Sequence, residues 1–423
     1  MFLLFKKTLA HFFDFVAPLS DFETNVSHRL DSSGTFGGKC GLFPKAGAKV
    51  LLFFDMTKCF GKKVQKKCKK SVFLPIFGQN SCLNGKILVT LRSNLSQMKK
   101  VLALGNALTD ILMQVSDEQV QSLGLVKGSM NHISLESARY IQDKFSTIRK
   151  SMIAGGSASN TVNALAALGT QTAFIGKIGN DEIGEFFRQN AERNGVRPVL
   201  LPSRLMSGNC IALITPDGER TFATYLGAAA NLKPENIMPE MFEGYDYFHI
   251  EGYIVQNHEL IAKAVRLAKE AGQVVSLDLA SFNVVNENKE FLTDLVEKYV
   301  DIIFANEDES FAYTHLAPED AVQELARQCR IAVVKVGKAG SFVQCGEERH
   351  HVPAVCTTCI DSTGAGDYYA AGFLYGQVHG YDLNTCAQIG TMVAGRVCEV
   401  LGAKLSDETW HELKGLINAL FMQ

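Results

Sequence analysis

From Met98 onward, short apolar runs alternate with stretches of helical periodicity, and this alternation constrains the fold more than any other feature. Strands joined through helices favour a mainly parallel sheet covered by helices on both faces. We therefore predict an α/β fold, a three-layer αβα sandwich. The predicted strands are 101–104, 172–175, 211–215, 247–250, 274–277, 302–305, 332–336 and 342–345. The predicted helices are 157–168, 183–194, 258–271, 287–299 and 321–329.

One stretch interrupts the alternation. The runs Cys210–Thr215 and Thr221–Tyr225 are separated by Pro216-Asp217-Gly218, with no helix between them. Two strand-like runs joined through a short Gly-containing turn are typical of a β-hairpin. We therefore expect a small β-lid, at about residues 205–232, inserted into the α/β core.

Residues 1–97 differ in character from the rest. They hold 15 Lys and Arg against 5 Asp and Glu, whereas residues 98–423 hold 27 against 39. Residues 1–97 show no sustained helical or strand periodicity. We therefore expect them to form a poorly structured basic leader before a folded domain of residues 98–423. Its basic run, residues 61–70, is interpreted as a solvated charge run, the alternative being a localisation or nucleic-acid patch. A further alternative is a wrongly extended start, with translation naturally beginning at Met98.

Whole-chain properties exclude several classes of partner. A formal net charge of −2 gives no general attraction to nucleic acid or to anionic membranes. No apolar run reaches the roughly 18 residues of a membrane span. The 11 cysteines lack the spacing of a disulfide framework. We expect reduced thiols and a cytoplasmic protein that binds neither membrane nor nucleic acid.

The segment Asp361-Ser-Thr-Gly-Ala-Gly-Asp367 carries the strongest chemical signal. The small residues Gly364, Ala365 and Gly366 let backbone N–H groups approach a phosphate, and the helix expected after them would present its positive end. Asp367 would lie beside this anion hole and could take a proton from a hydroxyl. The alternative is an ordinary Gly-rich turn that caps a helix.

Two further segments suit the binding of hydroxyl groups. Gly155 and Gly156 precede a predicted helix whose first turn contains Asn160, an amide that both donates and accepts hydrogen bonds. Asp110 follows the first strand, at the edge where open α/β sheets bind ligands. The alternatives are a tightly packed helix entry and a turn aspartate.

Two other segments have residues suited to bind a metal ion and a nucleotide. Asn306 and Glu309 follow a predicted strand with i,i+3 spacing, so both could organise magnesium-bound water, although the same pair is an ordinary helix cap. Gly337 and Gly340 follow another strand and suit nucleotide phosphates, with a simple β-turn as the alternative.

In order, these segments resemble the PfkB/ribokinase carbohydrate kinases over residues 98–423, and among them the adenosine kinases. The resemblance implies a ribokinase-like fold, ATP and Mg²⁺. It makes Asp367 the catalytic base, with an anion hole of Gly364, Ala365 and Gly366. It implies that Asp110, Gly155, Gly156 and Asn160 bind the hydroxyls of the acceptor. It implies that Asn306 and Glu309 hold magnesium and that Gly337 and Gly340 lie along the nucleotide. It also implies a monovalent cation such as K⁺ at Asp361.

The pointers to adenosine kinases are Gly105–Ile111 and Leu226–Leu232. The expected reaction is transfer of the γ-phosphoryl group of ATP to a primary hydroxyl of a ribose-containing acceptor, adenosine or a related nucleoside. Two departures are Tyr369, where the family usually has Phe, and Asp278–Ser281, where adenosine kinases tend to have Asn-Leu-Ser-Ala. The second change was expected toward the acceptor or lid. The alternatives are a kinase of ribose, fructose or a keto-sugar acid, and a non-catalytic family member.

We predict that residues 1–97 are dispensable, because a segment that buries little apolar surface does not offset its ordering entropy of roughly 1–2 kcal/mol per residue. A chain starting at Met98 should stay soluble, keep its melting temperature and keep its kinase activity. The full chain is the control. Insolubility, a melting temperature several degrees lower, or loss of most activity would show that the leader belongs to the fold.

Overall fold

The computed structural model describes residues 99–355 and 358–420, which fall within one compact unit. The expectations for residues 1–97 lie outside this part of the chain. Among the described helices, none has both the length and the apolar character needed to cross a bilayer.

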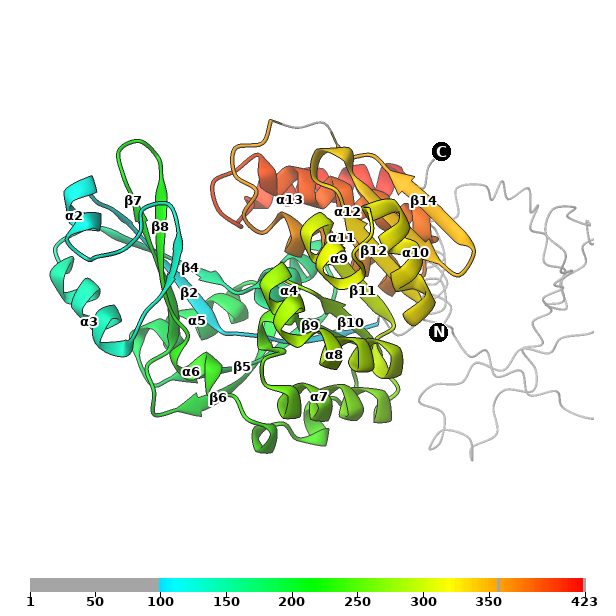
Figure 1. The fold of residues 1–423 in the computed structure, drawn as a ribbon, viewed down its shortest axis with the longest axis horizontal. Helices are drawn as coiled ribbons and strands as arrows, with labels where there is room; N and C mark the ends of the chain where they lie inside the picture. The colour runs from blue at the N-terminus through cyan, green and yellow to red at the C-terminus, as the bar shows by residue number, and fades with distance from the viewer. Residues whose placement is uncertain (1–98, 356–357, 421–423) are drawn as a thin grey trace, which may run out of the picture. The chain divides into compact units, whose positions relative to one another are not determined.

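Within the described residues, the larger sheet has nine strands in the order β14-β13-β12-β11-β10-β9-β1-β5-β6 (Figure 1). Neighbouring strands are parallel except for β12–β13 and β13–β14, which are antiparallel. The predicted α/β class with a mainly parallel sheet is therefore confirmed. The strands are β1 Val101–Leu104, β5 Thr172–Gly179, β6 Val196–Ser203, β9 Tyr247–Glu251, β10 Val274–Asp278, β11 Ile302–Asn306, β12 Ile331–Lys335, β13 Ser341–Cys345 and β14 Glu348–Val352.

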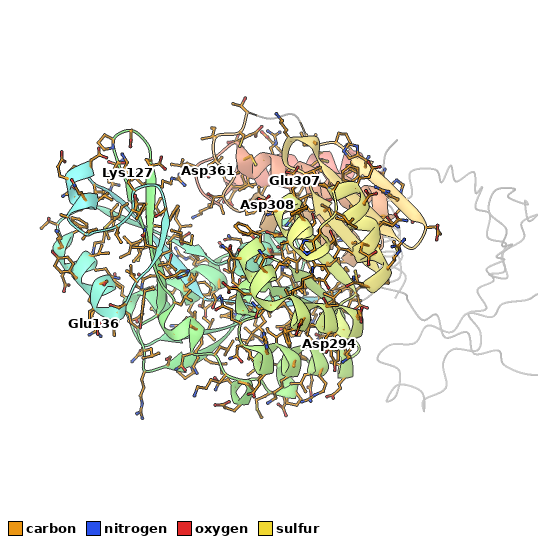
Figure 2. All side chains as sticks on the ribbon, viewed as in Figure 1. Lys127, Glu136, Asp294, Glu307, Asp308 and Asp361 are labelled. Atoms are coloured by element: carbon orange, nitrogen blue, oxygen red, sulfur yellow. The ribbon has the colours of Figure 1, made fainter. Side chains whose placement is uncertain are left out.

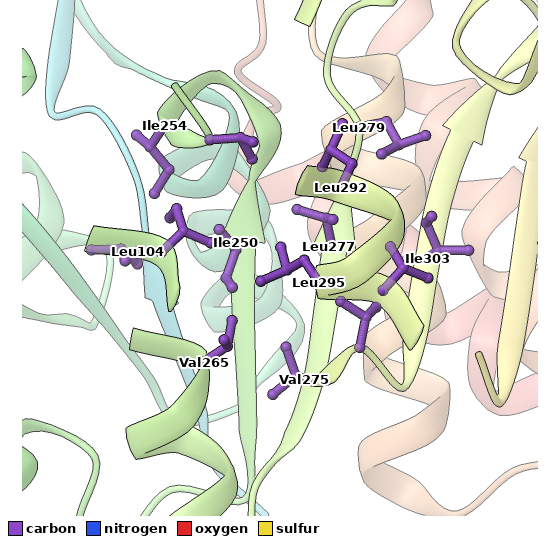
Figure 3. Close-up of a cluster of buried hydrophobic side chains, with 14 of the residues drawn as sticks. Leu104, Ile250, Ile254, Val265, Val275, Leu277, Leu279, Leu292, Leu295 and Ile303 are labelled. Atoms are coloured by element: carbon purple, nitrogen blue, oxygen red, sulfur yellow. The ribbon is translucent and has the colours of Figure 1, made fainter. Parts of the chain in front are cut away.

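Helices cover both faces of this sheet because successive strand residues point to opposite sides. On one face, strand residues pack against α7 (His258–Glu270), α8 (Phe282–Tyr299), α9 (Glu307–Thr314) and α10 (Pro318–Gln328). Figure 3 shows part of this cluster, with Ile250 and Leu277 facing Val265 and Leu295. The opposite face packs against α4 (Ser157–Leu168), α5 (Glu182–Arg193), α11 (Ala365–His379), α12 (Leu383–Cys398) and α13 (Asp407–Ala419).

The five predicted helices are all present, with two changed boundaries. Helix α10 begins at Pro318 rather than at residue 321. Helix α8 begins at Phe282 rather than at residue 287. Asn288, with φ −125°, introduces a kink that separates the first turns of α8 from its regular part. The apolar periodicity therefore indicated only the part of the helix beyond the kink.

The smaller sheet has five strands in the order β3-β8-β7-β2-β4. The predicted hairpin is confirmed as β7 (Gly208–Ile214) and β8 (Arg220–Tyr225), which pair antiparallel. The other strands come from earlier in the chain than the predicted lid of residues 205–232: β2 Leu108–Gln114, β3 Met130–His132 and β4 Lys150–Gly155. Helices α2 (Asp117–Gln121) and α3 (Leu135–Lys144) pack on one face of this sheet, and α6 (Gly227–Ala230) follows it.

The parallel strands of the larger sheet bring polar side chains to one edge. Adjacent strands β9, β10, β11 and β12 end at Glu251, Asp278, Asn306 and Lys335, and the register aligns Glu251 with Asp278 and Asn306 with Lys335. The carboxyl ends of parallel strands are where open α/β sheets bind ligands. The chain also passes from β1 into the smaller sheet at this edge, so both sheets border the same region.

Candidate active site

The carboxylate of Asp367 lies in the first turn of α11 and receives hydrogen bonds from helix α4. Ser157 Oγ donates to Asp367 Oδ1 at 2.7 Å, and Asn160 Nδ2 donates to Oδ2 at 2.8 Å. Burial raises the pKa of Asp367 to about 6, against the lowering effect of these two donors. The carboxylate is therefore fixed in position and can be ionised at neutral pH.

Two of these contacts differ from the sequence-based assignment. Asn160 was assigned to acceptor hydroxyls, but in the structure its amide donates to Asp367. Ser157 was given no role, although a hydroxyl at the first helical position after Gly156 was an available signal. Thr161 adds a third link, since its Oγ1 donates to the Asp367 carbonyl at 3.2 Å.

The predicted anion hole forms the N-terminus of α11. Gly364 is the N-cap residue and has φ 78°, a left-handed conformation that glycine adopts without steric cost. A β-carbon at Gly364 would lie 2.6 Å from the Ala403 β-carbon, and one at Gly366 would lie 3.1 Å from Lys335 Nζ. The N–H of Ala365 donates to the Ser362 carbonyl at 3.1 Å. The N–H groups that directly follow it in this turn have no partner within the helix, so they can donate to an anion.

Asp110 lies on β2 of the smaller sheet, beside the first glycine of the predicted pair. A β-carbon at Gly155 would come within 2.7 Å of Asp110 Oδ2, and one at Gly156, which has φ 92°, within 2.4 Å of the Asn106 carbonyl oxygen. Burial raises the pKa of Asp110 to about 6. The structure therefore brings together Asp110, Gly155 and Gly156, and close approach requires glycine at both positions.

Glu251, at the end of β9, is 1% exposed and ties the two acceptor segments together. Its Oε1 accepts from the Asn106 backbone N and from Asn106 Nδ2, both at 2.8 Å, and its Oε2 accepts from the Ala158 N at 2.9 Å. The sequence analysis missed this residue. The available signal was an acid at the end of an apolar strand, the same signal that identified Asp110.

Asn306 and Glu309 form the helix cap that the sequence also allowed. The Glu309 carboxylate accepts from the Asn306 N at 2.8 Å and from Asn306 Nδ2 at 2.7 Å, while Asn306 Oδ1 accepts from the Glu309 N at 2.8 Å. Burial raises the pKa of Glu309, which is 3% exposed, to about 7, although the charge of Lys335 opposes this. Figure 2 shows Glu307 and Asp308, the residues between them.

This arrangement fits an indirect contact with magnesium. Among the described residues, no three His, Cys, Asp or Glu side chains come together as a metal site. Mg²⁺ characteristically keeps several waters and takes one or two carboxylates together with substrate phosphates. The assignment of Asn306 and Glu309 to magnesium, through water, stays a prediction.

The carboxylate of Asp361, labelled in Figure 2, is already occupied by four donors. Oδ1 accepts from the Thr363 N at 3.0 Å and Thr363 Oγ1 at 2.7 Å, and Oδ2 accepts from the Gly402 N at 2.8 Å and Arg220 Nη1 at 2.9 Å. Burial opposes its charge, but these hydrogen bonds and Arg220 outweigh burial and lower the pKa of Asp361 to about 2. A cation could bind this carboxylate only by displacing a donor. The arrangement does not fit the predicted monovalent-cation role.

Gly337 begins a short 3-10 helix after β12, and Gly340 follows the last residue of that helix. Gly340 has φ 98°, and a β-carbon there would lie 2.0 Å from the Val352 carbonyl oxygen, so packing alone requires glycine at this position. Their assignment to the nucleotide stays a prediction. The side chain of this segment that reaches the first turn of α11 is Lys335, two residues before Gly337.

The chain is similar to one protein family and to several solved and curated proteins. The sequence pattern of the pfkB family of carbohydrate kinases matches residues 119–410, from α2 to α13. A probable sugar kinase from Rhizobium etli is 31% identical in sequence, with a TM-score of 0.66 over 75% of this chain and 99% of that chain. Adenosine kinase from Sinorhizobium meliloti is 33% identical, with a TM-score of 0.65 over 74% and 99%. Adenosine kinase from Saccharomyces cerevisiae is 26% identical over 332 residues, 73% of this chain and 97% of that protein.

The buried carboxylate of Glu251 predicts a dependence of stability on pH. Its pKa is raised by burial to about 7, whereas a glutamate in an unfolded chain titrates near about 4.3. Between these values the folded protein keeps a proton that the unfolded chain has released. The contribution of this group to stability is therefore full below pH of about 4.3 and is lost as the pH rises to about 7.

We expect Glu251→Gln to flatten this dependence. From pH of about 4.5 to about 7, the parent's free energy of unfolding should fall relative to the variant's by up to about 3 kcal/mol. Urea unfolding at a series of pH values measures the difference. Glu290→Gln, at an exposed position of α8, is the control, and its free energy of unfolding should depend on pH as that of the parent does. Parallel curves for the parent and Glu251→Gln would contradict the prediction.

Proposed function

The chain belongs to the pfkB family of carbohydrate kinases and is a sugar or nucleoside kinase, and from this premise we propose that it transfers the γ-phosphoryl group of ATP to a primary hydroxyl of a ribose-containing acceptor. The preferred acceptor in this proposal is adenosine or a related nucleoside. The observation that carries the proposal is the carboxylate of Asp367, held by Ser157 and Asn160 at the N-terminus of α11.

In this proposal Asp367 is the general base. Its side chain accepts the proton of the acceptor hydroxyl, because it is fixed beside the first turn of α11 and its pKa of about 6 leaves it mostly ionised at neutral pH. The N–H groups of that turn, around Gly364, Ala365 and Gly366, stabilise negative charge on the phosphoryl group. Bound ATP and Mg²⁺ supply the phosphoryl group and neutralise part of its charge.

The acceptor is assigned to the edge that both sheets border. Asp110 would accept hydrogen bonds from sugar hydroxyls beside Gly155 and Gly156, and Glu251 would hold the two segments at a fixed separation. Asn160 would act mainly by positioning Asp367. Asn306 and Glu309 are assigned to magnesium, and Gly337 and Gly340 to the nucleotide.

The departure at Asp278–Ser281 bears on the choice of acceptor. The departure at Asp278 was expected to lie toward the acceptor or lid, but Asp278 pairs with Lys335 across β11. The side chain of Asp278 therefore reaches the amine beside the first turn of α11, whereas the backbone of Asp278 and Leu279 packs against Gly252, which follows Glu251. The similarity to the Rhizobium etli sugar kinase keeps a sugar acceptor as the second candidate.

A cytoplasmic location completes the proposal. In this proposal ATP is the phosphoryl donor. The cysteines among the residues that the structure describes are free thiols. Reduced cysteines are usual in the cytosol.

The proposal is tested with ATP, Mg²⁺ and a panel of adenosine, other nucleosides, ribose and fructose. We expect the largest kcat/KM for adenosine or a related nucleoside. In Asp367→Asn, kcat should fall by at least about 10²–10⁴-fold while ATP affinity stays unchanged, since the base acts on the acceptor proton. A larger kcat/KM for ribose or fructose transfers the assignment to the sugar-kinase alternative. No transfer to any acceptor would favour a non-catalytic family member.

Ser157→Ala tests the positioning of the base. The Ser157 hydroxyl stabilises the ionised carboxylate of Asp367, so its loss should raise the pKa of that group. The acid limb of the pH profile of kcat/KM should therefore move to higher pH, by up to about one unit. Ser159→Ala, in the same helix, is the matched control and should leave the limb in place. An unshifted limb in Ser157→Ala would mean that the hydrogen bond does not tune the base.

A further inference from the structure

A buried ion pair lies beside the proposed phosphate site. Lys335 Nζ contacts Asp278 Oδ2 at 2.8 Å, and their side chains are 14% and 6% exposed. The two residues end β12 and β10, on either side of β11. Neither residue has a role in the function proposed above.

The ammonium group of Lys335 faces the anion hole. A β-carbon at Gly366 would lie 3.1 Å from Lys335 Nζ, so the amine lies directly against the backbone of the first turn of α11. Any side chain at position 366 would press on this amine. Glycine at this position therefore lets the amine lie close to the backbone of this turn.

Asp278 is held rigidly in the orientation that serves Lys335. Its Oδ1 accepts from the Ala280 N at 3.0 Å, which leaves Oδ2 for the amine. Ala280 has φ 63°, a left-handed conformation that is costly for a residue with a β-carbon. Such strain persists only where the surroundings impose it, and it is common at ligand sites.

Lys335 stays charged in this setting. Burial opposes its charge, but Asp278 and Glu309 outweigh burial and raise the pKa of Lys335. Asp278, Glu309 and Asp367 place negative charge around the amine. A highly charged phosphoryl group entering this region needs compensating positive charge, and the amine supplies it next to the helix N-terminus.

We propose that Lys335 is a further catalytic residue, whose ammonium group contacts the transferring phosphoryl group, and that Asp278 is its positioning residue. This inference rests on the proposed kinase function. In the transfer, the acceptor oxygen forms a bond to the γ-phosphorus as the bond to the ADP oxygen breaks. The acceptor proton goes to Asp367, and Lys335 keeps its own protons and acts by charge alone.

A purely structural ion pair is the competing explanation. Buried ion pairs contribute little net stability, because desolvation offsets their attraction. Removing one member leaves a buried charge without its partner and can prevent folding, so Lys335→Met alone is a poor test. The double variant Asp278→Asn/Lys335→Met removes both charges together and preserves side-chain size, so it is the informative protein.

The experiment compares the affinities for ATP and for ADP by calorimetry, without acceptor, and then kcat with the best acceptor. Because Lys335 is assigned to the γ-phosphoryl group, the double variant should lose at least about tenfold in affinity for ATP while that for ADP stays near the parent value. Its kcat should fall about 10²–10³-fold, as for loss of one oxyanion-hole donor. Asp278→Asn keeps the amine but removes its positioning partner, so, where it folds, it should lose part of the ATP preference and less than the double variant loses. Lys298→Met removes an exposed charge of α8 and is the charge control.

The outcomes separate the two proposals. If the folded double variant keeps the parent's ratio of ATP to ADP affinity and its kcat, the pair is structural and the inference is overturned. If the parent phosphorylates no acceptor but prefers ATP, and the double variant loses that preference, the kinase proposal fails while the contact of Lys335 stands. Loss of ATP preference in Lys298→Met as well would overturn the inference, because general charge would explain the effect.

Discussion

The hydrogen bonds from Ser157 and Asn160 to Asp367 tie the first turn of α4 to the first turn of α11. Two helix N-termini thereby converge on one carboxylate, and the positive ends of both helices face the same region. Small residues allow this approach, since Gly156 precedes α4 and Gly364 precedes α11 with positive φ angles. The acceptor segments, the anion hole and the base are arranged around this junction.

Electrostatic balance is the second constraint. Burial raises the pKa values of Asp110, Glu251, Glu309 and Asp367, so the region resists accumulating negative charge. Lys335 and the helix N-termini provide the opposing positive charge. In the proposed function, this balance would allow a region rich in carboxylates to accept a phosphate.

Each of the two sheets contributes different residues to the candidate site. The larger sheet presents Asp278, Asn306 and Lys335 at the ends of its strands, and the smaller sheet presents Asp110. Arg220 of β8 contacts Asp361 just before the anion hole, so an ion pair joins the smaller sheet to the loop that begins α11. This ion pair therefore couples the position of the smaller sheet to that of the loop before α11.

Local sequence determined the features that depend on neighbouring residues. Apolar periodicity identified the central strands of the larger sheet and five helices, the Gly-containing turn identified the β7–β8 hairpin, and i,i+3 spacing identified the cap formed by Asn306 and Glu309. Edge strands were missed because their composition is unusual: β6 contains Pro198 and Pro202, and β14 is charged. Both features are tolerated at a sheet edge but obscure the pattern of a strand.

Only the tertiary structure decided which side chains meet. The contacts of Asp367 with Ser157, of Glu251 with Asn106, of Arg220 with Asp361 and of Lys335 with Asp278 join residues 210, 145, 141 and 57 positions apart. Such pairs leave no local periodicity, because strand order and crossover connections create them. The sequence alone thus determined the fold class and predicted the glycine loops and Asp367 as the base, while the tertiary structure decided which side chains hold Asp367 and which amine lies against the first turn of α11.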